Sequence, residues 1–222
     1  MTRTAKSRQD FVSQDAGLHV VEVNARIALP TWIERERAVS LWMHGASTRV
    51  WVLGLLIPIS RVGDGWIWYL IVALLPWIGG GSGTSAAVRM FCVGGLNIVL
   101  YKIIKRWIAR PRPFRTCAKF QQRVVSLDEF SFPSGHTLHS VACSVILTAY
   151  YPAAAFVVWP FALLVAVSRI VLGLHYPTDV IAGAFIGATT AVVSFNLLKM
   201  CAIARRCFWP SDAQTEASWF WS

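Results

Sequence analysis

The chain has 222 residues, of which 55% are hydrophobic and 14% charged, whereas a soluble domain carries about 25% charged residues. This composition excludes intrinsic disorder, a collagen-like fibre and a small disulfide-stapled domain. The formal net charge is +10, and basic residues gather in the first 50 residues and between Lys102 and Arg123. We therefore predict a one-domain polytopic membrane protein whose partners are anionic lipid headgroups or phosphate substrates rather than nucleic acid.

The N-terminal third begins with a polar segment and leads into the first apolar one. Residues 1–30 lack the short apolar core of a cleaved signal peptide, so we expect this segment to be retained. Residues 31–44 mix aromatic and aliphatic side chains with charged ones and predict an interfacial helix. Residues 50–60 are free of charge but shorter than the roughly 20 residues of a transmembrane helix, which makes them the weakest predicted span.

The remaining apolar stretches predict the body of a membrane bundle. Residues 65–88 are charge-free and contain a glycine-rich turn at 79–83, and residues 90–101 continue as a third span. Residues 130–168 hold no Asp, Glu, Lys or Arg and are too long for one span, so we expect a helical hairpin that turns at Pro152, because Pro cannot continue a helix. Residues 180–198 predict the last span.

Together these segments predict an all-α fold, a polytopic membrane helix bundle of about six transmembrane helices preceded by an interfacial helix. We expect three regions in the chain. They are a polar N-terminal tail with the interfacial helix at 1–45, a transmembrane core at 46–205 and a C-terminal interfacial tail at 206–222.

Polar residues at the ends of membrane spans are costly, so they indicate function. Three clusters stand out, and they contain Lys105 and Arg112, then Ser134, Gly135 and His136, then Arg169, His175 and Asp179. The first two clusters flank one loop, and the last two flank a hairpin that crosses the membrane and returns. All three clusters are therefore expected on one face of the membrane.

The residue types in these clusters suit phosphoryl chemistry. Lys and two Arg side chains can bind a tetrahedral dianion, and two histidines can divide the roles of nucleophile and general acid. His175 and Asp179 are four residues apart, so on one helical turn the carboxylate would hold one ring nitrogen and leave the other to attack phosphorus. Such an attack needs no metal, and the five cysteines form no C-x-x-C pair that would support a zinc site. We predict no metal and no other cofactor.

The pattern Lys-x6-Arg-Pro, Pro-Ser-Gly-His and Ser-Arg-x5-His-x3-Asp, at residues 105–113, 133–136 and 168–179, resembles the signature of the type 2 phosphatidic acid phosphatase superfamily. These are lipid phosphate phosphatases, and the short chain is similar to their compact bacterial members. The resemblance implies that His175 forms a phosphohistidine, that Asp179 orients it and that His136 protonates the leaving group. It assigns phosphate binding to Lys105, Arg112, Ser134, Gly135 and Arg169.

The implied activity is metal-independent dephosphorylation of a membrane lipid phosphate or diphosphate, of the undecaprenyl diphosphate, phosphatidylglycerol phosphate or phosphatidic acid class. Three alternatives remain open: a lipid A 1-phosphatase, a phosphotransferase that uses the same site, and a non-catalytic lipid-phosphate binding or transport protein. Further cations near the first cluster, Arg110 among them, serve either a second phosphate or lipid headgroups.

The expected partners are the lipid phosphate substrate and membrane lipids, with no nucleic acid and no obligate protein partner. The resemblance implies a bacterial inner membrane, with the active site facing the periplasm or exterior. The distribution of Lys and Arg does not by itself choose between the two orientations.

Overall fold

The computed structural model describes residues 31–124 and 128–208, with side chains up to residue 197. The chain divides into two compact units, Met1–Glu36 and Arg37–Ser222. Every regular element in the described residues is a helix, which confirms the predicted all-α class. The expected regions at 1–45, 46–205 and 206–222 stay predictions, and the retained N-terminal segment and nearly all of the C-terminal tail lie outside the described residues.

The first described helices are α2, Thr31–Gly45, the short η1, Ala46–Thr48, and α3, Val50–Val62. Helix α2 covers the segment expected to lie in the interface. Helix α3 buries Val52 and Leu56 with Val171 of a later helix in a small apolar cluster. It runs past the charge-free segment because Arg61 fits in its last turn, where a cation opposes the negative end of the helix dipole.

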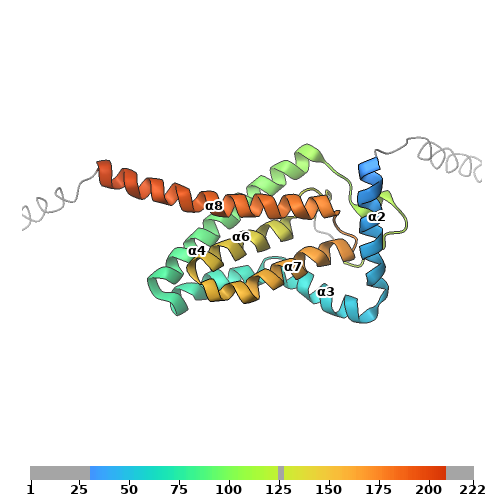
Figure 1. Cartoon of the computed structure of the whole chain (residues 1–222), viewed down its shortest axis with the longest axis horizontal. Helices are drawn as coiled ribbons and strands as arrows, with labels where there is room; N and C mark the ends of the chain where they lie inside the picture. Colours follow the sequence, from blue (N-terminus) through green and yellow to red (C-terminus); the bar gives the residue numbers. More distant parts are fainter. Residues whose placement is uncertain (1–30, 125–127, 209–222) are drawn as a thin grey trace, which may run out of the picture. The chain divides into compact units, whose positions relative to one another are not determined.

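Helix α4, Trp66–Ile108, consists of two arms that meet at Gly80. Gly80 has φ 55° and ψ −133°, a conformation open to glycine because it has no Cβ, and Figure 1 shows α4 turning back between its teal and green parts. The reversal confirms the predicted glycine-rich turn. The prediction that the next span starts after Arg89 is wrong. The second arm starts at the glycine reversal, and Arg89 lies inside this arm, where polar and aromatic neighbours hold it.

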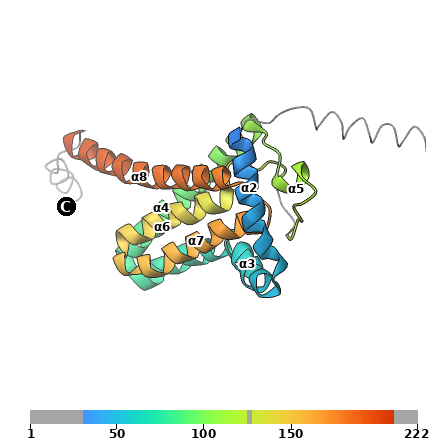
Figure 2. The same cartoon turned by 45° about the vertical axis from the view of Figure 1, so that its right-hand side comes forward.

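The predicted hairpin is present as α6, Gly135–Tyr150, and α7, Ala155–Val171, joined by η2, Pro152–Ala154. A four-residue helix, α5, Pro113–Thr116, precedes it, and α8, Pro177–Phe208, follows it. Helix α6 packs against α4, α7 and α8, and Figures 1 and 2 show it between α7 and α8. Its fully buried side chains include Leu138 and Ile146, which makes α6 the centre of the bundle.

Two glycines allow α6 and α8 to approach closely. A Cβ at Gly183 would lie 2.5 Å from the carbonyl oxygen of Ser134, and a Cβ at Gly187, one turn later, would collide with the backbone of Leu138. Small residues four apart are typical of tightly packed membrane helices. This contact fixes the start of α6 against the start of α8, where two of the predicted site clusters lie.

Within residues 31–124 and 128–208, three stretches are long and apolar enough to cross a membrane: Trp66–Thr116, which includes the reversal at Gly80, Pro152–Val171 and Pro177–Leu197. Helix α3 is apolar but shorter. Large apolar side chains such as Trp77, Phe156 and Phe185 are exposed on these helices, as expected for surfaces solvated by lipid. The prediction of about six transmembrane helices stays a prediction.

Candidate active site

A cavity of about 160 Å³ lies where the ends of the helices meet their connecting loops. It is lined by six of the eight predicted site residues, Lys105, Arg112, Gly135, His136, Arg169 and His175. The other lining residues are Gly63, Asp64, Gly65, Tyr69, Ile98, Tyr101, Val124, Asp128 and His139. The structure therefore brings the three sequence clusters together, as expected from counting spans.

Three buried cations surround the cavity. Lys105, Arg112 and Arg169 are 5%, 2% and 5% exposed. Arg112 donates from Nη1 to the carbonyl oxygen of Leu174 at 3.0 Å, and Arg169 donates from Nη1 to the hydroxyl of Ser60 at 2.6 Å. Buried charges are stable only when an opposite charge or hydrogen bonds compensate them. Such a cluster of cations suits a phosphate dianion.

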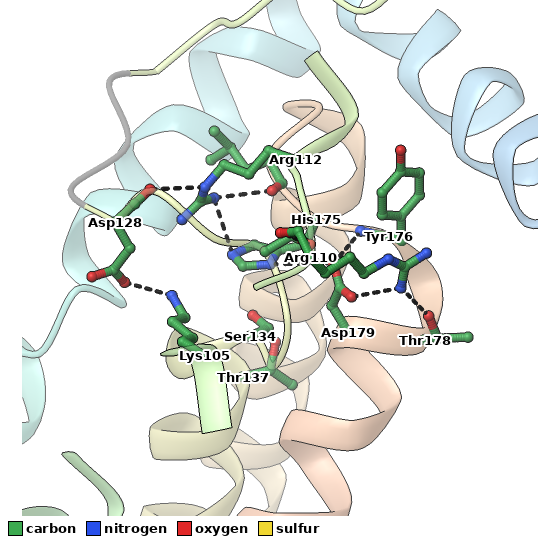
Figure 3. Close-up of polar contacts among 12 residues, drawn as sticks. Lys105, Arg110, Arg112, Asp128, Ser134, Thr137, His175, Tyr176, Thr178 and Asp179 are labelled. Carbon is green, nitrogen blue, oxygen red and sulfur yellow. Dashed lines mark hydrogen bonds and ion pairs between the residues drawn. The ribbon is translucent and has the colours of Figure 1, made fainter. Parts of the chain in front are cut away.

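Asp128 compensates part of the buried positive charge. Oδ2 of Asp128 forms an ion pair with Nζ of Lys105 at 2.5 Å, and the backbone oxygen of Asp128 accepts a hydrogen bond from Nε of Arg112 at 2.9 Å (Figure 3). The Asp128 side chain is 41% exposed, so it reaches the cluster from the open side. An incoming phosphate and Asp128 would compete for the same ammonium group.

His175 lies at the centre of the cluster and is 1% exposed. Its Nε2 lies 3.4 Å from Nη1 of Arg112. Burial, followed by the positive charges of Arg169, Arg112 and Lys105, lowers the pKa of His175 well below its ordinary value. The imidazole is therefore neutral, and a neutral imidazole has the nitrogen lone pair that a nucleophile needs.

Asp179 lies behind His175 and is fully buried. Its Oδ2 is 3.6 Å from Nδ1 of His175 and accepts a hydrogen bond from the backbone N–H of Tyr176 at 2.8 Å. The expected shared helical turn of His175 and Asp179 is wrong. Helix α8 begins at Pro177, and a proline restricts the residue before it to extended backbone, so His175 belongs to the loop. Asp179 instead caps the helix start, in the third helical position.

Arg110 is part of this arrangement, although its sequence position suggested a second phosphate or a lipid headgroup. Its Nη1 donates to Oδ1 of Asp179 at 2.8 Å and to the hydroxyl of Thr178 at 2.7 Å. Its guanidinium lies 4.2 Å from the ring centroid of Tyr176 (Figure 3). Arg110 therefore holds the carboxylate that lies next to His175.

His136 stands in the first turn of α6 and forms an ion pair with Asp64, in the loop between α3 and α4. Partial burial alone would raise the pKa of Asp64, but the hydrogen bond to His136 and the charges of His136 and Arg169 bring it below its ordinary value. Asp64 is thus ionised. Burial and the charge of Arg169 lower the pKa of His136 to about 4, and the hydrogen bond and charge of Asp64 oppose this shift by stabilising the protonated ring. A protonated imidazole at the cavity wall can act as a general acid.

Ser134 and Gly135 stand at the N-terminal end of α6 but differ in their access to the cavity. Ser134 is the residue before the helix and is fully buried; its hydroxyl lies 3.1 Å from that of Thr137. Its backbone N–H donates to the carbonyl oxygen of Asp179 at 2.9 Å. Among the described residues, Gly135 lines the cavity and Ser134 does not.

Sequence reasoning missed Asp64 and Asp128 and misplaced Arg110. Each of them pairs with a residue far away in the sequence. Asp64 pairs with His136, Asp128 with Lys105 and Arg110 with Asp179, at separations of 72, 23 and 69 positions. Asp64 did carry one signal, since it is an acidic residue between two apolar segments and is flanked by Gly63 and Gly65.

The family model described as the PAP2 superfamily matches residues 86–202. The chain is 42% identical over 83 residues to decaprenylphosphoryl-5-phosphoribose phosphatase of Mycolicibacterium smegmatis, covering 36% of this chain and 43% of that protein. It is 33% identical over 116 residues to phosphatidylglycerophosphatase B of Bacillus subtilis, covering 47% and 54%. The matched regions thus span about half the length of these two relatives.

The fold also matches a solved structure. It is the crystal structure of the first transmembrane PAP2 type phosphatidylglycerolphosphate phosphatase from Bacillus subtilis, which superimposes with a TM-score of 0.65 at 25% identity. The match covers 82% of this chain and 94% of that one. Together with its apolar helices, this likeness makes the chain an integral membrane protein.

Proposed function

The chain belongs to the PAP2 superfamily, as its motifs predicted, and from this premise we propose that it hydrolyses a membrane lipid phosphate or diphosphate through a phosphohistidine on His175. The observation that carries the proposal is a neutral, buried His175 beside three buried cations, Lys105, Arg112 and Arg169, in one cavity. A site that only binds lipid phosphate has no need of a neutral nucleophile next to a second histidine.

In the proposed first step, Nε2 of His175 attacks phosphorus while the bond from phosphorus to the leaving oxygen breaks. The three cations stabilise the negative charge that builds up on the phosphoryl oxygens. Asp179, held by Arg110 and the Tyr176 N–H, orients the ring. His136, whose protonated form Asp64 stabilises, gives its proton to the leaving oxygen.

In the proposed second step, water attacks the phosphohistidine. His136 is now neutral and takes a proton from that water, and the phosphorus–nitrogen bond breaks to release inorganic phosphate and restore His175. Capture of the phosphoryl group by another alcohol would use the same residues. Oxygen-18 from labelled water should appear in the released phosphate; label-free phosphate transferred to an added alcohol would identify a phosphotransferase instead.

The size of the cavity supports a lipid substrate. A space of about 160 Å³ lies below the roughly 300–1,000 Å³ of sites that enclose whole small molecules. It suits a phosphate headgroup whose hydrocarbon tail stays in the bilayer. The two relatives are named for a decaprenylphosphoryl phosphoribose and a phosphatidylglycerol phosphate, so we propose an isoprenyl or glycerolipid phosphate, including undecaprenyl diphosphate.

The proposal is tested by phosphate release from a panel of lipid phosphates and diphosphates with the purified protein in detergent. His175→Ala should abolish release while the protein stays folded, because the nucleophile is lost. Glu129→Gln, which alters an exposed surface ion pair with Arg115, is the matched control and should keep full activity. Release by His175→Ala at the wild-type rate would rule out the mechanism, and loss of activity in EDTA would reveal a required metal.

We further propose that the protein lies in a bacterial inner membrane with the cavity open to the periplasm or exterior. Cys117 supports a direct test because it lies in the loop on the cavity side and is partly exposed. In a variant whose other cysteines are replaced by serine, a membrane-impermeant thiol reagent should label Cys117 in intact cells. Labelling only after lysis would place the cavity in the cytoplasm.

A further inference from the structure

A second, larger groove lies along the second arm of α4. Its volume is about 770 Å³, within the roughly 300–1,000 Å³ typical of ligand sites. One wall is apolar and consists of Val88, Cys92 and Leu96, which lie one helical turn apart on the same face. Tyr150 at the end of α6 and Ser194 of α8 complete it. No described residue lines both this groove and the active-site cavity.

Among the residues that the structure describes, Arg89 is the one cation that lines the groove. Its Nε lies 3.3 Å from the hydroxyl of Tyr150, its Nη1 lies 3.4 Å from the hydroxyl of Ser194, and its guanidinium stacks 4.0 Å from the ring centroid of Phe195. All of these partners are neutral. Among the described residues, no carboxylate pairs with Arg89 and no atom accepts a hydrogen bond from its Nη2.

An arginine inside a membrane helix normally pairs with an anion or reaches the headgroup layer, because its charge is costly in hydrocarbon. Along α4, Arg89 lies about 24 Å from Lys105 at the active-site end and about 14 Å from Gly80, at roughly 1.5 Å per residue. The hydrocarbon core is about 30 Å thick. Arg89 is therefore close to the headgroups of the leaflet opposite to the active site.

We propose that the groove binds an anionic glycerophospholipid of this opposite leaflet. The lipid phosphate pairs with Arg89 and supplies the missing negative charge, and an acyl chain lies along the wall formed by Val88, Cys92 and Leu96. Thr84 and Ser85 line the part of the groove toward the Gly80 turn, where they place hydroxyl groups beside the lipid headgroup. The bound lipid is a phosphodiester and is separate from the substrate of the active site.

The test measures lipid binding to the full-length protein. Native mass spectrometry in detergent, with added phosphatidylglycerol or phosphatidylcholine, should show preferred binding of one phosphatidylglycerol. Arg89→Gln should weaken this binding about ten- to hundredfold, as expected for lost hydrogen bonds to a charged group. Cys92→Trp should weaken it as well, by filling the groove while leaving Arg89 in place.

Two control variants separate this site from other lipid contacts. Phe91 is on the same helix and 73% exposed but does not line the groove, so Phe91→Trp should bind phosphatidylglycerol as the wild type does. Lys105→Gln should also bind normally, because it alters only the active-site cavity. Equal affinity for both lipids, unchanged binding by Cys92→Trp, or loss in Lys105→Gln without loss in Cys92→Trp would each overturn the proposal.

Discussion

At the scale of single residues, the environment of His175 makes it a base weaker than ordinary histidine. Burial and the neighbouring cations lower its pKa, so the ring stays neutral below the usual value of about 6.5. Protonation of the nucleophile should therefore reduce kcat/KM only at a pH below about 6.5. A profile of kcat/KM against pH for the wild type measures this limit.

Replacing one cation should move this limit in a known direction. Arg169 is the first of the charges that lower the pKa of His175. Removing that charge makes protonation of His175 easier, so in Arg169→Gln the acid limb of the kcat/KM profile should shift to higher pH. Arg169→Lys keeps the charge and should hold the limb close to that of the wild type. Identical acid limbs in wild type and Arg169→Gln would contradict this account of His175.

A second residue-scale prediction concerns Asp64, which sequence reasoning missed. Its ion pair with His136 favours the protonated ring that gives a proton to the leaving oxygen. Asp64→Asn should lower kcat by about 10²-fold, the lower end of what general acid catalysis contributes. The loss should shrink with an aryl phosphate, whose leaving group needs no proton. An equal loss with both substrates would show that Asp64 has only a structural role.

At the scale of elements, the site depends on the close contact of α6 and α8. Gly183→Ala places a Cβ against the backbone of Ser134 and should push the two helices apart, because neither backbone can yield. We expect the free energy of unfolding to fall by about 1–3 kcal/mol. This loss should appear as a lower melting temperature in detergent, together with a reduced kcat. The matched control is Gly95→Ala in α4, where nothing lies within 4 Å, and it should leave the melting temperature unchanged or raise it.

Helix boundaries show what sequence patterns can and cannot predict. The hairpin turn at Pro152 and the reversal at Gly80 were predictable, because the geometry of proline and glycine is a local property. The continuation of the second arm of α4 through Arg89 was not. It depends on Tyr150, Ser194 and Phe195, which come from other helices and compensate the charge. The same holds for Asp179, whose place in the first turn of α8 depends on Pro177.

At the scale of the whole molecule, counting spans was sufficient to predict that the three polar clusters meet. It could not predict the acidic residues that join them, because Asp64 and Asp128 lie in connections whose paths depend on tertiary packing. The structure also assigns different places to five of the cations. Lys105, Arg112 and Arg169 line the cavity, Arg110 holds Asp179, and Arg89 lies in a separate groove.

The most direct test of the central claim is detection of a phosphoryl group on His175. Rapid quenching at alkaline pH, where phosphohistidine persists, followed by mass spectrometry of the peptide that contains residue 175, should reveal it during turnover of a lipid phosphate. It should accumulate in His136→Ala with an aryl phosphate, because attack still occurs while the water step has lost its base. It should be absent from His175→Ala. Steady hydrolysis with no phosphoryl group on His175 in both the wild type and His136→Ala would contradict the account.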